Sequence, residues 1–243
     1  MDLKIEVYGL TDIGHIRKKN EDVFEILEDN LIFSVADGMG GHKAGDIAAQ
    51  TATKEINNLL LKTITSNIST ANVIYHINLA IKEVNSRIYN LSRANIDFLG
   101  MGTTLCFLHL RSTDAIFAHV GDSRIYHYKK NSLIQLTKDH SLINKLKDQN
   151  KVFNKKSCKN IITKAIGTYP KIEPSVNSTP YDKGDIFLLT TDGLTDYISN
   201  ENIKILIETF EDPKNLCEIL IKEAKNNGSS DNITALVIKI VQK

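Results

Sequence analysis

Short apolar runs, and stretches in which apolar and polar residues alternate, occur at several places along the chain and predict β-strands. Residues 4–10 alternate, whereas residues 31–36 are almost continuously apolar and end at Asp37-Gly38, which is typical of a buried strand. The same criteria predict strands over residues 103–110, 115–120, 125–128, 186–191 and 233–241. Short turns join the first three of these, so we expect a meander.

Apolar residues recur every three or four positions between these strands, which predicts amphipathic helices. Two such segments follow one another after Gly45, and a third begins at Asp212, an N-cap aspartate followed by proline at the first helical position. The apolar faces comprise Ala48, Ala52, Ile56, Leu59 and Leu60; Val73, Ile77, Ala80, Ile81, Val84, Ile88 and Leu91; and Leu216, Ile219, Leu220 and Ala224. This order of strands and helices predicts an α+β layered sandwich with helices on the outer faces of the sheets.

Residues 142–160 have the weakest pattern, because they are rich in lysine and asparagine and contain few apolar positions. We interpret them as a mobile surface segment or flap. Residues 1–243 contain neither an internal repeat nor a low-complexity linker, and their number fits one large domain or two small ones.

The composition narrows the possible functions. The 243 residues carry a formal net charge of +1, so no overall field would hold the protein on nucleic acid or on an anionic membrane. The lysine-rich residues 145–159 include only one aromatic residue, Phe153, and therefore lack the stacking platform that single strands favour. We expect neither a nucleic-acid nor a membrane partner.

The cysteines and the N-terminal residues indicate the cellular compartment of the protein. Cys106, Cys158 and Cys217 are odd in number and lack CxxC spacing, which argues against a disulfide framework and against a zinc site. Residues 1–10 do not resemble a signal peptide, and no segment approaches the ~18 apolar residues of a membrane span. We expect a cytoplasmic protein.

Three aspartates stand at the ends of predicted strands. Asp37 and Asp192 each end an apolar strand and precede glycine, and Asp231 immediately precedes the last strand. Asp-Gly is also the commonest hairpin signal, but both pairs here lead into helical segments. If the strands are neighbours, the carboxylates meet at one edge, where their repulsion calls for a cation. Oxygen ligands suit hard ions such as Mg²⁺ or Mn²⁺.

Two other stretches are less specific when taken alone. Residues 12–22 combine Arg17 with the adjacent acids Glu21 and Asp22, a composition that is commonly a solvated loop. Residues 38–41 are rich in glycine, but Lys43 replaces the third glycine of a GxGxxG motif and no GxxxxGK[ST] motif is present. A nucleotide-binding loop is therefore not supported.

Taken together and in order, these stretches resemble the PPM family, the metal-dependent serine/threonine protein phosphatases of type 2C, particularly the compact bacterial kind. The resemblance implies a single domain over residues 1–243. Its expected fold is a four-layer α-β-β-α sandwich of two antiparallel sheets flanked by helix pairs, with metal ions in a cleft at one end. The blocks that carry it are residues 11–14 with Arg17 and 20–22, 35–42, 101–104, 121–124, 136–141, 162–167, 189–194 and 231–234.

The resemblance also implies a set of metal ligands. Asp37 matches the carboxylate that bridges two ions, Gly38 offers its carbonyl oxygen to one of them, and Asp192 and Asp231 match ligands of the other. Glu21 matches a ligand near Gly38. Asp122 matches a ligand, shared with Asp192, of a weaker third ion. Asp22 and Asn232 match supporting residues.

Arg17 matches the arginine that binds the substrate phosphate, a task that suits its planar guanidinium group. We expect Arg17, Asp37 and Asp192 to carry the catalysis. Relatives outside bacteria place a proposed general acid, a histidine, in this Asp-Gly loop, where Met39 follows the pair here. His42 lies nearby, and both a general acid and a structural histidine at the helix start remain open. The flap is also a few residues shorter than usual.

Two ions about 3.5–4 Å apart would bridge one water and lower its pKa, which supplies a hydroxide nucleophile near neutral pH. The expected function is hydrolysis of phosphoserine and phosphothreonine on proteins, opposing a serine/threonine kinase of the same pathway, by a monomer. One alternative is a catalytically inactive regulatory module of the same fold. Another is a phosphatase dedicated to one small regulatory protein.

Overall fold

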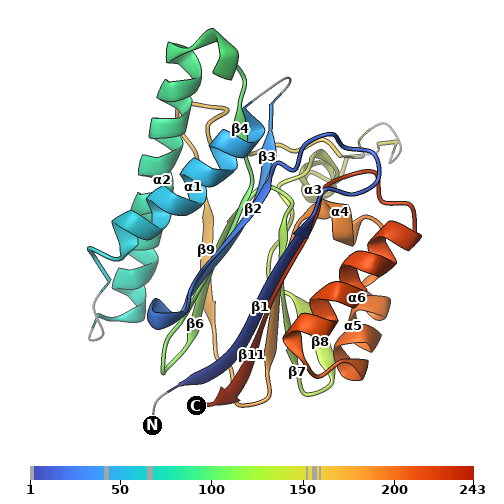
Figure 1. Ribbon diagram of the computed structural model, residues 1–243. Helices are drawn as coiled ribbons and strands as arrows, with labels where there is room; N and C mark the ends of the chain where they lie inside the picture. The colour runs from blue at the N-terminus through green and yellow to red at the C-terminus, as the bar shows by residue number, and fades with distance from the viewer. Residues whose placement is uncertain (1–2, 41–43, 65–67, 152, 155–157, 159) are drawn as a thin grey trace.

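Two antiparallel sheets pack face to face at the centre of the molecule (Figure 1), in a computed structural model that describes residues 3–40, 44–64, 68–151, 153–154, 158 and 160–243. The first sheet has the order β1 (Lys4–Asp12), β11 (Ile233–Gln242), β10 (Ile186–Thr190), β7 (Arg124–Lys129) and β8 (Ser132–Gln135). The second has the order β2 (Asp22–Leu27), β3 (Ile32–Met39), β5 (Leu105–Leu110), β6 (Ala115–Val120) and β9 (Ser175–Thr179), with β4 (Gly102–Thr103) paired to β3.

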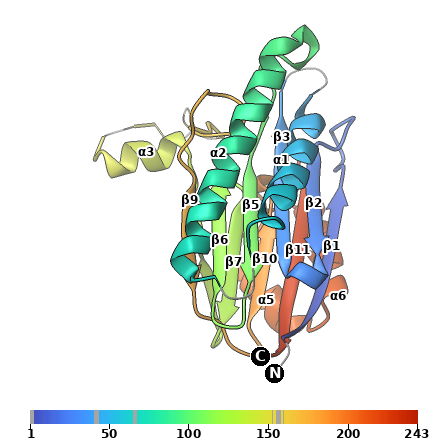
Figure 2. The same cartoon turned by 90° about the vertical axis from the view of Figure 1, so that its left-hand side faces the viewer.

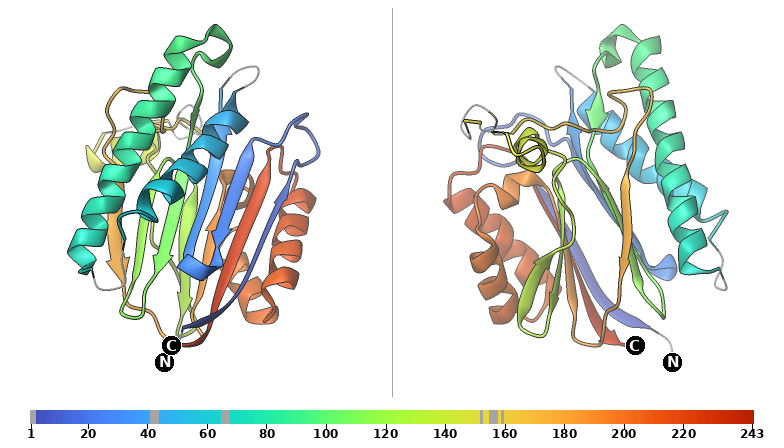
Figure 3. Two further views of the ribbon diagram at one scale, coloured as in Figure 1. Left: turned by 60° about the vertical axis from the view of Figure 1, so that its left-hand side comes forward. Right: turned by 180° about the vertical axis from the view of Figure 1, so that it is seen from behind.

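A pair of long helices covers the outer face of each sheet (Figures 2 and 3). Helices α1 (Gly45–Leu60) and α2 (Thr70–Ala94) lie on the second sheet, and α5 (Asn200–Thr209) and α6 (Pro213–Asn226) lie on the first. The shorter helices are α3 (Leu142–Asp148), α4 (Asp192–Thr195) and the 3-10 turns Glu28–Asn30 and Ile96–Phe98. The predicted α+β sandwich of four layers is confirmed.

Three apolar layers hold these elements together. Phe33, Phe187 and Leu236 belong to the layer between the sheets, and the outer layers lie beneath the two helix pairs. The predicted helix faces are buried there, except that Leu59 and Ile219 are partly buried and Leu91 is 38% exposed near the end of α2. The predicted start of α6 is confirmed: the Asp212 carboxylate accepts a hydrogen bond from the Asn215 N–H, with Pro213 in the first turn.

Several elements lie outside the sequence predictions. Strand β2 was not predicted; it begins at Asp22, the last residue of the stretch interpreted as a charged loop. Strands β8 and β9, also not predicted, each form one edge of a sheet. Residues 142–148 of the predicted flap form helix α3, which Ser141 caps by accepting from the Asn144 N–H. Helix α3 contains no buried residue. The interpretation of residues 142–160 as a mobile surface segment or flap stays a prediction, and residues 152, 155–157 and 159 lie outside the described residues.

The chain ends and the predicted ligands occupy opposite ends of the sheets. Lys4 of β1 pairs with Gln242 of β11, whereas the other end of this ladder pairs Asp12 with Ile233, beside Asp231. Figure 1 shows both termini at the bottom and the strand ends that carry the aspartates at the top. No helix in the part of the chain that the structure describes is both long and apolar enough to span a bilayer.

Candidate metal centre

Both sheets contribute acids to one end of the sandwich. In the second sheet, Asp22 begins β2 and lies directly opposite Asp37 of β3 in the ladder. In the first sheet, Asp192 follows β10 and Asp231 precedes β11, and these two strands are neighbours. Strand pairing therefore brings Asp192 and Asp231 together within the first sheet. The packing of the two sheets brings Asp37 close enough for both charges to act on it.

Burial and mutual repulsion disfavour the charged forms of these acids. Burial, followed by repulsion from Asp22, Asp192, Asp231 and Asp122, raises the pKa of Asp37 well above its ordinary value. Burial, followed by repulsion chiefly from Asp122 and Asp231, raises the pKa of Asp192 to about 8. Such a cluster is costly at neutral pH unless positive charge neutralises it.

The Asp22 side chain connects the two sheets within the cluster of acids. It is only 5% exposed, and its Oδ2 accepts hydrogen bonds from the hydroxyls of Thr191 (2.8 Å) and Thr234 (2.7 Å) in the opposite sheet. Burial raises the pKa of Asp22 to about 7, although both threonines act to lower it. The two hydroxyls fix the carboxylate, so Asp22 is placed to support the acids around it.

The backbone of Asp37 is held by two threonines. The Asp37 N–H donates to the Thr104 hydroxyl (2.9 Å), and the Asp37 carbonyl accepts from the Thr103 hydroxyl (2.9 Å) and the Thr104 N–H (2.9 Å). The Thr104 hydroxyl also lies 2.6 Å from that of Ser123, the residue after Asp122. This chain of contacts fixes Asp37 relative to the loop that carries Asp122.

Glu21 lies at a close approach of strand β3 and helix α1. Its carboxylate accepts a hydrogen bond from the Gly45 N–H, and its carbonyl accepts from the Gly38 N–H at 3.1 Å. A Cβ on Gly38 would collide with the carbonyl group of Gly45. Only glycine allows this approach, which leaves the Gly38 region beside Glu21, as the resemblance implied.

Arg17 reaches the cluster from the connection between β1 and β2. Its Nη2 donates to Asp231 Oδ2 at 2.7 Å, while half of its side chain stays exposed. Asp37 and Glu21 also interact favourably with its charge. The guanidinium group therefore stands at the rim of the acids rather than among them.

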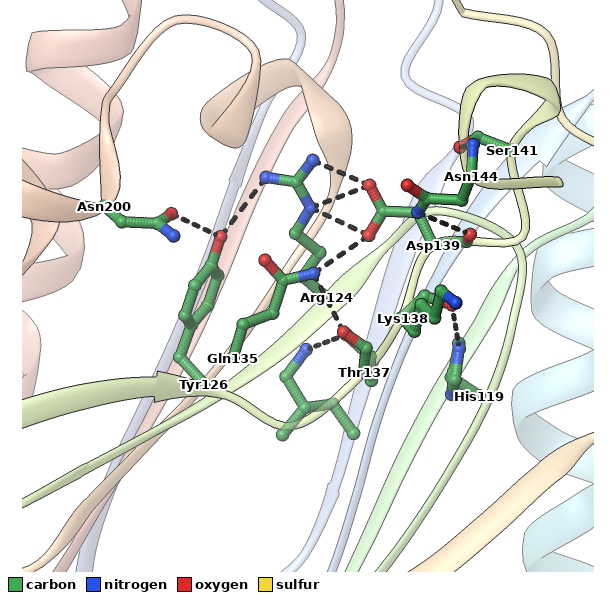
Figure 4. A network of polar contacts seen from close by, with 11 residues as sticks. His119, Arg124, Tyr126, Gln135, Thr137, Lys138, Asp139, Ser141, Asn144 and Asn200 are labelled. Carbon is green, nitrogen blue, oxygen red and sulfur yellow. Dashed lines mark hydrogen bonds and ion pairs between the residues drawn. The ribbon is translucent and has the colours of Figure 1, made fainter. Parts of the chain in front are cut away.

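Figure 4 shows a second polar network around Arg124 and Asp139, and the charges of both residues act on Asp122. Burial, then repulsion from Asp139, raises the pKa of Asp122 to about 6. Asp139 accepts from Arg124 through Nε (3.0 Å) and Nη2 (2.7 Å), and its carbonyl accepts from Asn144 of α3 (3.0 Å). The network thus connects the loop of Asp122 to α3, beside a cavity of about 430 Å³ that Lys138, Asp139, His140 and α3 help to line.

The comparison with known proteins identifies this architecture. Residues 15–226 match the family model described as protein phosphatase 2C. The serine/threonine phosphatase stp of Listeria welshimeri is 34% identical over 236 residues, which cover 94% of this chain and 93% of that protein. The chain belongs to the protein phosphatase 2C family.

Solved structures of the protein phosphatase 2C kind agree with this assignment. The serine/threonine phosphatase of S. agalactiae superposes with a TM-score of 0.90 at 32% identity, over 98% of this chain and all of that one. The catalytic domain of the phosphatase PstP, determined in complex with two manganese ions, superposes with a TM-score of 0.87 at 28% identity, over 99% and 100% of the two chains. The predicted family and fold are confirmed.

The donor chemistry of the site fits the divalent metal that the protein phosphatase 2C family requires. The Oδ1 atoms of Asp22, Asp122 and Asp192 are shielded from solvent and have no hydrogen-bond partner in the structure. As the side chains stand, the described residues contain no preformed cage of three His, Cys, Asp or Glu side chains around one point. What favours a cation is the unsatisfied carboxylate oxygen in three neighbouring acids, the ligand type that hard divalent ions prefer.

Two sequence predictions of this site are incomplete or lie beyond the structure. His42 lies outside the described residues, so its role stays a prediction. Sequence reasoning assigned no role to Thr103, Thr104, Thr191 and Thr234, which hold the acids, because contacts between strands far apart in the sequence leave no local pattern. It also missed Asp196, which adds to the repulsion on Asp192; the spacing of four residues along α4 would have placed them on one face.

Proposed function

We propose that this chain is a metal-dependent protein serine/threonine phosphatase that hydrolyses phosphoserine and phosphothreonine on proteins. The observation that carries this function is the set of acids that both sheets contribute to one end of the sandwich. Three of their shielded carboxylate oxygens have no hydrogen-bond partner among the described residues. Membership of the protein phosphatase 2C family supports it. The alternative of a catalytically inactive module is not favoured, because the relatives are named phosphatases.

The residues proposed to hold the metal are Glu21, Asp37, the Gly38 carbonyl, Asp122, Asp192 and Asp231. When bound, Mn²⁺ or Mg²⁺ would supply Lewis-acid stabilisation of phosphoryl oxygens and a lowered pKa for coordinated water. Two ions are proposed for the principal site, and the position of Asp122 beside Asp192 supports a weaker third. The carboxylates supply the negative charge that attracts the ions, and the threonine hydroxyls hold Asp22 and Asp37 in position.

Arg17 is the group proposed to bind the substrate phosphate. Its exposed guanidinium lies at the rim of the acids, where it remains accessible to a phosphoprotein while Asp231 fixes one of its nitrogens. Two parallel N–H donors then match two phosphate oxygens, and the positive charge stabilises the transition state as charge spreads over them. Asp22 and Asn232 support the site without touching the substrate.

The proposed partners are phosphorylated proteins and a serine/threonine kinase whose products this enzyme would dephosphorylate. We also propose that the protein acts as a monomer, binds neither nucleic acid nor membranes, and works in the cytoplasm. The three free, buried thiols Cys106, Cys158 and Cys217 suit a reducing compartment. The near-neutral overall charge supports the absence of a polyanionic partner.

The test is a phosphatase assay of the purified chain on a phosphothreonine peptide and on p-nitrophenyl phosphate, with Mn²⁺, Mg²⁺ or excess EDTA. We expect turnover with metal, none with EDTA, and none for Asp192→Ala. Asp185→Asn is the matched control, because Asp185 is a buried acid that pairs with His127 at the opposite end of β10. No turnover by the folded chain with either ion would favour the inactive module. Activity on p-nitrophenyl phosphate alone would favour a phosphatase dedicated to one protein.

A further inference from the structure

One buried amide holds both ends of the loop that carries Arg17. Asn232 is only 5% exposed, and its side-chain Nδ2 donates to the carbonyls of Ile13 (3.0 Å) and Lys19 (3.0 Å). Its Oδ1 accepts from the N–H of Glu21 at 2.9 Å. Both amide hydrogens and the oxygen are thus used on three points of residues 13–21, which we call the Arg17 loop.

The backbone beneath this amide is itself fixed. The Asn232 N–H donates to Asp231 Oδ1 at 2.8 Å. A Cβ on Gly193 would collide with the Asn232 carbonyl oxygen, and a Cβ on Gly14 would collide with the Asp231 carbonyl oxygen. The backbone of residues 231–232 is therefore packed between helix α4 and the Arg17 loop, so the Asn232 side chain starts from a fixed point beside a predicted metal ligand.

Closure of the loop affects the entropy that Arg17 loses on binding phosphate, because its side chain is long and half-exposed. Among the described residues, its guanidinium group makes one hydrogen bond, to Asp231. An arginine on an untethered loop would lose both loop and side-chain freedom when it gripped a phosphate. Tethering residues 13 and 19 to one side chain removes the first of these costs in advance.

We propose that Asn232 is a positioning residue that closes the Arg17 loop into a ring and so presets Arg17 for an incoming phosphate group. The inference rests on the proposed function, in which Arg17 binds the substrate phosphate. Two adjacent residues would then have different roles: Asp231 is a proposed metal ligand, and Asn232 positions Arg17, the proposed phosphate-binding residue. A purely structural role would stabilise the fold without acting through Arg17.

The chain offers a matched control for that distinction. Asn85 of α2 is 1% exposed, its Nδ2 donates to the Tyr169 carbonyl (3.0 Å), and its Oδ1 accepts from the Gly167 N–H (2.8 Å). It is thus a buried amide that braces a loop from both sides, but the loop carries none of the predicted ligands. Its loss should cost stability comparably and leave phosphate binding intact.

The experiment is a double-mutant cycle read by calorimetric titration of inorganic phosphate into the Mg²⁺-loaded protein. We expect Asn232→Ala to weaken phosphate binding about tenfold when Arg17 is present, and less than about twofold in an Arg17→Ala background. Asn85→Ala should change the affinity less than about twofold. Equal losses for Asn232→Ala in both backgrounds, or no loss in either, would overturn the proposal.

A second readout covers variants that fold poorly and separates this proposal from the proposed function. In hydrogen exchange of the metal-free protein, Asn232→Ser and Asn232→Ala should selectively lose protection at amides 13–21, whereas Asn85→Ala should not. Unchanged exchange there would contradict the ring. Phosphate binding and exchange need no turnover, so an inactive wild type would refute the proposed function while the cycle still tests Asn232.

Discussion

The two carboxylate oxygens of Asp22 have different surroundings. Its Oδ2 receives two threonine hydroxyls from the opposite sheet, while its Oδ1 is shielded and has no partner in the structure. The satisfied oxygen anchors the side chain, and the unsatisfied one adds to the local demand for positive charge. Asp122 and Asp192 share the second property. Removing one such charge should therefore affect stability and activity in opposite directions.

Asp192→Asn tests this opposition. We expect turnover to fall more than about 100-fold, beyond the loss that supporting residues of metal sites usually cause. In EDTA at pH 8 we expect the melting temperature to rise by roughly 3 °C, because repulsion with Asp122 and Asp231 is relieved. Activity assays and thermal unfolding measure the two effects. A variant that loses activity and also melts lower would show that Asp192 stabilises the metal-free fold.

Arg17→Ala should act mainly on substrate binding. The loss of charge-assisted hydrogen bonds to phosphate is expected to raise KM about tenfold or more, with a smaller change in kcat. Arg17→Lys should recover only part of the loss, because an ammonium group cannot reproduce the planar pair of donors. Steady-state kinetics on the phosphopeptide decide between this and a pure effect on kcat, which would confine the contribution of Arg17 to the transition state.

The sequence was informative about acids and uninformative about what holds them. Asp37, Asp192 and Asp231 were visible because each adjoins a strong apolar strand, and strand ends gather at sheet edges. The hydroxyls of Thr191 and Thr234 reach Asp22 from the other sheet, across more than 160 positions of sequence. Such contacts depend on how two sheets stack, which no local pattern encodes. The same holds for the three bonds of Asn232.

At the scale of elements, close backbone approaches set the site. Helix α4 begins at Asp192, and its next residue, Gly193, packs directly against the Asn232 carbonyl next to β11. The hydroxyl of Ser229 also donates to the Gly193 carbonyl at 2.8 Å. A methyl group at Gly193 would push α4 away from residues 231–232, and thus separate two predicted ligands.

Gly193→Ala should accordingly lower the free energy of unfolding by about 1–3 kcal/mol, the usual cost of overpacking, and reduce turnover strongly. Gly228→Ala is the control: its φ of +84° disfavours alanine, but no atom lies within 4 Å of the added Cβ. We expect a cost of about 1–2 kcal/mol there, with turnover retained. Denaturant unfolding and the peptide assay report the two effects. Full activity of Gly193→Ala would contradict the role given to this contact.

Three of the elements that escaped prediction, β8, β9 and α3, share a physical cause, namely little burial. Strands β8 and β9 are edge strands of largely polar sequence, because each has only one neighbour and little buried surface. Helix α3 contains no buried residue, so its apolar positions give no clear stripe. By contrast, α1 and α2 lie flat on a sheet and carry strong stripes. Patterns of hydrophobicity report burial, and elements with little burial leave little pattern.

At the scale of the whole molecule, the acids between the two sheets make the stability of the fold depend on pH. The pKa values of Asp122, Asp22 and Asp192 are raised to about 6, 7 and 8, against an ordinary value of 3.8. The folded state thus binds more protons than the unfolded state between these limits, so its stability falls as pH rises. The loss should begin near pH 4 and be complete above about pH 8.

The predicted outcome is a melting temperature in EDTA that declines from pH 5 to pH 8, and that Mg²⁺ or Mn²⁺ restores most strongly at pH 8. Thermal unfolding across this range, with and without metal, measures it. Asp192→Asn in EDTA should flatten the decline. A metal-free protein that gains stability with rising pH would contradict the assigned direction of these pKa shifts.

The pairing of Lys4 with Gln242 also has a practical consequence for handling the protein. Both ends of the chain emerge side by side at the pole of the molecule opposite the acids (Figure 3). A surface, dye or fused reporter attached at either end would therefore leave the reactive pole facing open solution. A short peptide that joined the two ends would likewise permit new termini elsewhere, so a circularly permuted enzyme should retain its catalytic pole.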